Sequence, residues 1–192
     1  TDTIKNETYP MYISTLDREK KKKKDCFWME IEVAIPKNPL VATRILAEET
    51  KEGPGELMDV IVQVQGYDAF RVPKKFYQEK KGKGGAKPRE VAQFKPAQSV
   101  KKLERKAVLY RSRTITAWNL EAIDGNGRPL KALVSEEVPP IAVCTAETAD
   151  TLMTLEDWGL GAKTKITGQP VNFYLWIMDQ VSKGMAQDKQ AR

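Results

Sequence analysis

The sequence of 192 residues contains no histidine. This absence excludes every catalytic unit built on an imidazole base, such as Ser-His-Asp or Cys-His, and every histidine-ligated zinc or iron site. Only two cysteines are present, which is too few for a Cys₄ metal site or a disulfide framework. The catalytic route that remains is a set of carboxylates that hold a metal ion.

Long apolar runs and an export signal are also missing. The apolar stretches are far shorter than the ~20 residues that span a bilayer, and residues 1–12 lack a basic start followed by an apolar core. We therefore expect no membrane association and a location in the reducing cytoplasm of a cell or an infected host. The hydrophobic content of 41% and the length suit one soluble domain over residues 1–192.

Positive charge is concentrated in two parts of the chain. The net charge is +6, but residues 71–113 hold 15 basic and 3 acidic residues, whereas residues 114–160 hold 2 basic and 8 acidic ones. The second basic cluster is the unbroken lysine run from Lys20 to Lys24. Like charges at this density repel one another, so they are usually solvated or placed opposite an anion. Two such clusters favour a polyanionic partner.

Hydrophobic patterning predicts an α+β fold. Its antiparallel β-rich core would be OB-like, or a related open barrel or sheet, with flanking helices and a C-terminal helix. Strands are predicted over residues 26–35, 57–65, 107–123 and 129–135, the last two joined by the hairpin signal Asp-Gly-Asn-Gly. In the first strand, Met29 and its alternating apolar neighbours are expected on the buried face, with Glu30 and Glu32 on the other. The lysine run, which directly precedes this strand, is expected at a sheet end or a hairpin tip.

Helical periodicity is predicted over residues 38–50, 145–158 and 170–185, which makes residues 145–192 a helical C-terminal part. Residues 74–106 lack a regular apolar period and are rich in glycine and lysine, so they are predicted to form a long basic loop or insertion with a helical turn at 100–106. The largely apolar helix Phe173–Met185 also offers a surface for self-association.

Aromatic residues alternate with basic ones, a pattern typical of proteins that bind single-stranded nucleic acid. Cations follow the phosphates, and unpaired bases stack on the rings. Tyr67 and Phe70 precede Arg71, and they stand with Phe76 and Tyr77 in loop-like sequence. The predicted nucleic-acid-binding residues are Lys20, Lys21, Lys22, Lys23, Lys24, Arg71, Lys74, Lys75, Phe76, Tyr77, Lys80, Lys81, Lys83, Lys87, Arg89, Arg111 and Arg113.

Two other kinds of site were weighed against this one. The glycine-rich stretch 82–85 has neither the preceding buried strand nor the following Ser or Thr of a phosphate-binding loop, so no nucleotide cofactor is expected. Glu30, Glu32, Asp59 and Asp68 lie on or beside predicted strands and would form a metal site if those strands paired. This leaves a carboxylate–metal nuclease as one alternative. Cys26 and Cys144 lie in apolar sequence and are expected to be buried thiols.

The sequence therefore predicts a non-enzymatic nucleic-acid-binding protein that prefers single strands and needs no cofactor or metal. A structural or assembly subunit of a virion or nucleoprotein complex is the other alternative, because the basic and acidic segments of different copies could meet. No basic helix is present to enter a major groove, which argues against duplex recognition. No motif in the chain is specific enough to indicate a family.

Overall fold

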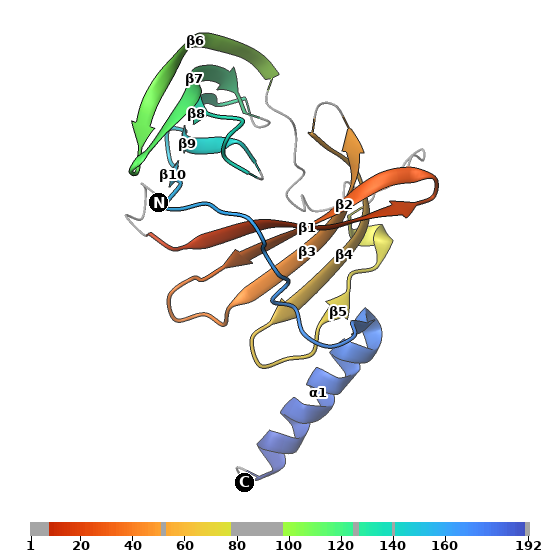
Figure 1. Ribbon diagram of the computed structural model, residues 1–192. Helices are drawn as coiled ribbons and strands as arrows, with labels where there is room; N and C mark the ends of the chain where they lie inside the picture. Colours follow the sequence, from red (N-terminus) through yellow and green to blue (C-terminus); the bar gives the residue numbers. More distant parts are fainter. Residues whose placement is uncertain (1–7, 51–52, 78–97, 125–126, 140, 191–192) are drawn as a thin grey trace. The chain divides into compact units, whose positions relative to one another are not determined.

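The computed structural model describes residues 8–50, 53–77, 98–124, 127–139 and 141–190. This part of the chain is mostly β, with a six-stranded and a five-stranded sheet, neither closed into a barrel, and a C-terminal helix (Figure 1). The chain forms two compact units: unit 1 is Thr1–Tyr9 with Ala92–Gly161, and unit 2 is Pro10–Val91 with Ala162–Arg192. In sequence, most of unit 1 is thus inserted into unit 2. The expected single domain stays a prediction, and each unit is described by itself.

Unit 2 is built on the six-stranded sheet, in the order β1-β2-β3-β4-β5-β11. Its strands are β1 (Met11–Lys21), β2 (Lys24–Val33), β3 (Val41–Thr50), β4 (Gly53–Val64), β5 (Phe70–Arg71) and β11 (Val171–Asn172). All neighbours are antiparallel except β5 and β11, which are parallel. The predicted strands at 26–35 and 57–65 are confirmed as β2 and β4. The lysine run is confirmed at a hairpin tip, between β1 and β2.

The expectation for the faces of β2 was partly wrong: Met29 is buried, as expected, but the opposite face is buried as well. Glu30 and Glu32 are buried, with only 4% and 5% of their surface exposed, whereas Ile31 and Val33 are half-buried. The reason is that residues 162–167, which lie far along the chain, pack against the carboxylate face. Ile166 of this segment belongs to the same core cluster as Trp28 of β2.

Both buried carboxylates are satisfied by residues 162–167. Glu30 accepts hydrogen bonds from the Thr164 hydroxyl and from the Lys165 backbone N–H, the latter at 2.8 Å. Glu32 forms an ion pair with the Lys165 Nζ at 2.7 Å. A buried carboxylate is tolerated only with such partners. Charge–dipole and charge–charge contacts therefore hold this segment on the sheet, in addition to the apolar contact of Ile166.

Unit 1 is built on the five-stranded antiparallel sheet, in the order β10-β9-β8-β7-β6. Its strands are β6 (Gln98–Tyr110), β7 (Arg113–Ile123), β8 (Pro129–Val134), β9 (Val143–Glu147) and β10 (Leu152–Thr154). The core cluster contains Ile115, Ala117, Val138 and Cys144, each at most 3% exposed. The predicted hairpin and its return strand are confirmed as the β7–β8 connection and β8.

Four sequence-based element predictions were wrong. Residues 38–50 form β3 rather than a helix, because pairing with β2 on one side and β4 on the other outweighs their helical spacing. Residues 145–158 likewise give β9 and β10, which are joined by a turn in which the Thr148 N–H donates to the Thr151 carbonyl. Residues 100–106 belong to β6 and not to the predicted basic loop over 74–106, of which residues 78–97 lie outside the described residues. The predicted run 107–123 is interrupted by a tight turn at Arg111–Ser112.

The C-terminal helix α1 (Phe173–Gln190) confirms the predicted helix at 170–185. Asn172 caps its start, because the Asn172 side-chain oxygen accepts a hydrogen bond from the Tyr174 N–H at 2.9 Å. Phe173 and Trp176 pack against Phe70 of β5, with ring centroids 5.6 Å and 4.5 Å apart. Within the described residues, no helix is long and apolar enough to cross a membrane.

The attachment of residues 162–167 can be tested with an isosteric pair of substitutions. Thr164→Val removes the hydroxyl that donates to the buried Glu30 carboxylate, so we expect the free energy of unfolding to fall by about 1.5–3 kcal/mol. Thr167→Val removes from the same segment a hydroxyl that accepts only an exposed hydrogen bond from the Gln63 amide at 3.2 Å, and we expect a change of less than about 1 kcal/mol. Denaturant unfolding of both variants, followed by tryptophan fluorescence, measures the difference. Equal losses would contradict the role given to Glu30.

Candidate nucleic-acid interface

The β1–β2 turn consists of two lysines in a conformation that lysine rarely adopts. Lys22 has φ 52° and Lys23 has φ 66°, and both residues are exposed. A two-residue hairpin with positive φ at both positions normally uses Asn-Gly or a similar pair. Each non-glycine residue in the left-handed region costs about 1 kcal/mol. The protein accepts this cost at the point where two ammonium groups project from the sheet.

The other lysines of the run are compensated by carboxylates. Lys21 pairs with Asp59 at 2.9 Å, and Lys24 contacts Glu48 at 2.8 Å and Glu56 at 3.0 Å. The hydrogen bonds that Lys24 donates to Glu48 and Glu56 raise the pKa of its ammonium above the ordinary value. The five lysines predicted to bind phosphate are therefore not equivalent. Within the described part of the chain, Lys22 and Lys23 have no ion pair.

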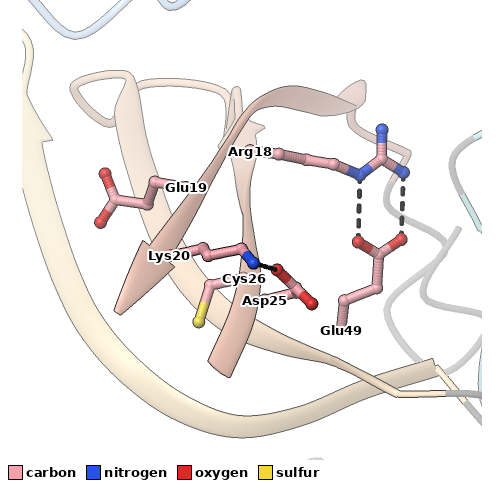
Figure 2. Close-up of a pocket in the computed structure, with 6 residues that line it drawn as sticks. All are labelled: Arg18, Glu19, Lys20, Asp25, Cys26 and Glu49. Carbon is pink, nitrogen blue, oxygen red and sulfur yellow. Dashed lines mark hydrogen bonds and ion pairs between the residues drawn. The ribbon is translucent and has the colours of Figure 1, made fainter. Parts of the chain in front are cut away.

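The pocket beside this hairpin is lined by paired charges. Figure 2 shows the Arg18 guanidinium turned toward the Glu49 carboxylate and Lys20 turned toward Asp25. The Arg18–Glu49 contact is bidentate, at 3.0 and 3.1 Å, and the Lys20–Asp25 distance is 3.5 Å. These pairs offset each other's charge, so this side of the hairpin offers little to an anion. The free charge is at the turn.

A second basic stretch lies at the same end of the sheet as the lysine turn (Figure 1). Asp59 is buried and contacts both Lys21 of β1 and Arg71 of β5, the latter at 3.3 Å. Arg71 leads into the short 3₁₀ helix η1 (Lys74–Phe76). The pKa of Glu56 is lowered mainly by the hydrogen bond from Lys24, and the charges of Lys22 and Lys74 lower it further. Two basic stretches about 50 residues apart in sequence are thus brought together.

An exposed ring accompanies these cations. Phe76 of η1 is 43% exposed, and its inner edge rests on Phe173 of α1 at a centroid distance of 5.5 Å. The Lys75 ammonium lies 5.1 Å from the Phe76 ring centroid and 5.2 Å from that of Tyr174. We call this group the basic end of unit 2: Lys22, Lys23, Arg71, Lys74, Lys75 and Phe76.

The remaining aromatic residues near η1 have mainly structural contacts. Phe70 is buried under α1, and Tyr67 stands edge-on to Trp176 at 6.3 Å. Tyr77 is partly buried, which raises the pKa of its phenol, and its hydroxyl lies 3.5 Å from the Met58 carbonyl oxygen. Tyr174, which is 48% exposed, was not among the predicted site residues. Its only sequence signal was the apolar character of the first turns of the helix.

The predicted site residues of unit 1 are engaged in ion pairs. Arg111 contacts Glu156 at 2.7 Å, and Arg113 lies 3.8 Å from Asp157. The Arg113 guanidinium also stacks on Trp158, at 4.6 Å from its ring centroid. These contacts hold the β6–β7 turn against residues 155–158. Lys80, Lys81, Lys83, Lys87 and Arg89 lie outside the described residues.

Unit 1 also contains a basic and aromatic group that the sequence analysis missed. Lys102 and Arg105 of β6 lie over the ring of Trp118 on β7. Only the pairing of β6 with β7 brings these residues together. Because residues 100–106 were predicted to form a helical turn, the sequence analysis did not place Lys102 and Arg105 beside Trp118.

The carboxylates considered for a metal site do not converge. β3 lies between β2 and β4, so Glu30 and Glu32 do not face Asp59 across a strand pair. Each of the three has a basic or hydroxyl partner, as described above. Among the described residues, no group of three or more Asp, Glu, His or Cys side chains is placed to hold a metal ion. Cys26 and Cys144 are buried free thiols, as predicted, and burial raises the pKa of Cys144.

Known proteins give no further indication of the function. Comparisons with protein-family models, with curated proteins and with solved structures find no match for this chain. The residues of the basic end are therefore the basis for a functional proposal.

Proposed function

We propose that the protein is a non-enzymatic binding protein for single-stranded DNA or RNA, and that the basic end of unit 2 contacts the nucleic acid. The observation that carries this proposal is that Lys22 and Lys23 lie at the same end of the sheet as η1. This short helix contributes Lys74, Lys75 and the exposed Phe76. Cations spaced around an exposed ring suit a chain in which phosphates alternate with unpaired bases. The strained lysine turn supports the same conclusion, because strain is often retained where a site needs it.

A single strand fits this site better than a duplex. Groove recognition uses a basic helix or ribbon that enters the groove. Among the described side chains of α1, the basic Lys183 is paired with Asp179 at 2.6 Å, so this helix offers no free cation to a groove. The proposed likeness to an OB-type fold lies in the position of the binding residues and not in the strand topology. In both, the hairpins and loops of an antiparallel sheet carry the aromatic rings and the cations.

The charge contribution can be tested at the strained turn. Replacing Lys22 and Lys23 by glycine removes two phosphate contacts, so the slope of log affinity against log salt for oligo-dT should become less steep by about 1.4. The same change relieves the left-handed strain, and the free energy of unfolding should rise by about 1 kcal/mol or more. Fluorescence anisotropy between about 50 and 200 mM salt and denaturant unfolding measure the two effects.

Lys37 provides a matched control at the other end of β2. It is exposed and also has a positive φ, of 66°, so Lys37→Gly removes a charge and relieves strain in the same way. We expect this variant to gain stability and to keep its affinity and salt slope. Equal losses of affinity per charge removed at the two turns would show that only net charge matters, and would contradict a site at the basic end.

Stacking can be separated from charge with two neighbouring residues. Phe76→Leu keeps an apolar side chain but removes the ring, so binding of oligo-dT should weaken by about 1–3 kcal/mol with an unchanged salt slope. Lys75→Ala should instead reduce the slope by about 0.7. The same titrations measure both variants. If the Phe76 variant bound oligo-dT with wild-type affinity, base stacking on Phe76 would be ruled out.

A second candidate function is assembly with further copies of the chain. Tyr174, Ile177, Met178 and Val181 recur at helical spacing and are 39–66% exposed, so one face of α1 is an uncovered apolar stripe. Phe173 and Trp176 use the other side of the helix to hold it on unit 2. Because like stripes on two copies are complementary, we propose self-association through α1. It is compatible with cooperative binding along a strand.

Self-association predicts a salt-resistant oligomer in the absence of nucleic acid. Met178→Glu places a carboxylate in the stripe and should shift the molar mass, measured by light scattering, to that of the monomer. Lys183→Glu places a carboxylate outside the stripe and should leave the oligomer intact. A monomeric wild-type protein at high concentration would contradict this candidate without touching the binding proposal.

A further inference from the structure

The proposed function leaves unused a basic and aromatic surface on the sheet of unit 1. The Lys102 Nζ lies 5.2 Å from the Trp118 ring centroid, and the Arg105 guanidinium carbon lies 5.0 Å from it. Both basic residues are exposed, and Trp118 is half-buried. A single lysine on an edge strand is enough to prevent edge-to-edge aggregation. Two cations over one indole ring therefore need another explanation.

The strand register places these residues on the face of the sheet that is opposite the core of unit 1. Arg105 is the register partner of Trp118, and Lys102 is that of Leu120. Side chains alternate along a strand, so Ile115 and Ala117, which belong to the core cluster, lie on the other face. We call the face that carries Trp118 the outer face. Leu120, Ala132 and Val134 extend it as a half-buried apolar floor.

The two faces of the same strands differ in how their charges are compensated. On the face that carries Ile115 and Ala117, but beyond the core cluster, exposed register partners alternate in sign across four strands, in the order Lys101, Glu121, Lys131 and Glu147. Opposite charges in direct register offset one another, which is typical of a solvated sheet surface. On the outer face, neither Lys102 nor Arg105 has an ion pair with a described residue. The Glu137 carboxylate accepts a hydrogen bond from the Thr116 N–H at 2.8 Å, and it is not paired with Lys102 or Arg105.

Cations without an ion pair over a half-buried ring suit an anionic partner that also has flat apolar groups. An acidic peptide supplies the charge but no regular series of flat rings. A single strand supplies both, because each phosphate is followed by a base that can stack on an indole while the displaced cations bind the flanking phosphates. The apolar floor beside Trp118 suits the face of a neighbouring base.

We propose that the outer face of unit 1 is a further contact surface for single-stranded nucleic acid. Trp118 would stack with a base, and Lys102 and Arg105 would bind the phosphates on either side of it. This inference rests on the proposed function and assigns a role to residues outside the basic end of unit 2. It also gives unit 1 a part in binding that does not involve Arg111 and Arg113, whose charges are already paired.

The two faces of β6 provide a matched experiment. Lys102→Ala with Arg105→Ala removes two charges from the outer face, and Lys101→Ala with Lys106→Ala removes two from the opposite face of the same strand. With oligo-dT of about 30 nucleotides, long enough for more than one contact surface, the outer-face pair should lose roughly tenfold or more in affinity at about 0.1 M salt. The opposite pair should lose less than about threefold. Equal losses, or no loss in either pair, would overturn the inference.

The stacking role has its own readout. Trp118→Leu should lower the affinity for oligo-dT by about fivefold or more and leave binding of poly-glutamate, which has charge without bases, unchanged. If both affinities fall together, the surface recognises anionic polymers in general and the inference is wrong. The glycine variants of Lys22 and Lys23 separate the two proposals: if they lose affinity while the outer-face variants do not, only this inference fails. If the wild-type protein does not bind oligo-dT at low salt, the proposed function itself fails.

Discussion

The arrangement of the basic end depends on one buried carboxylate. Asp59 is 5% exposed and contacts Lys21 at 2.9 Å and Arg71 at 3.3 Å. A carboxylate withdrawn from water costs several kcal/mol unless opposite charges and hydrogen bonds offset it, so both basic partners are needed where they lie. One contact fixes the last residue of β1 and thereby the lysine turn, and the other fixes β5 and thereby η1. The buried Asp59 carboxylate thus holds Lys21 and Arg71 in place, while Lys22 and Lys23 have no ion pair with a described residue.

Elements were predictable where a local signal agreed with the final packing. Alternation in β2 and β4, the Asp-Gly-Asn-Gly turn and the apolar period of α1 are such cases. Residues 38–50 were not predictable, because Val41, Ile45 and Leu46 fit a helical spacing as well as a strand, and only the neighbouring strands decide between them. The turn at Arg111–Ser112 contains neither glycine nor asparagine, so no turn signal divides the run 107–123.

The location of the candidate site in the sequence was predictable, but the ion pairs of its individual residues were not. Charge density and the nearby rings indicated the lysine run and residues 71–77, and the structure brings these together. Which lysines are already paired could not be seen, since Asp59, Glu48 and Glu56 lie 24 to 38 residues away in sequence. The burial of Glu30 and Glu32 likewise depends on a segment more than 130 residues along the chain. Contacts of this range have no local pattern.

The insertion of unit 1 into unit 2 has a consequence for synthesis of the chain. The strands β1 to β5 leave the ribosome long before residues 162–172, which neutralise Glu30 and Glu32 and supply β11. About 90 residues lie between the two parts, which corresponds to roughly 5–20 s of translation. During that interval the nascent sheet has two unsatisfied carboxylates on a surface destined for burial and a missing edge strand, while unit 1 is being made. Unit 1 therefore completes its sheet first, and unit 2 closes only when the C-terminal segment arrives.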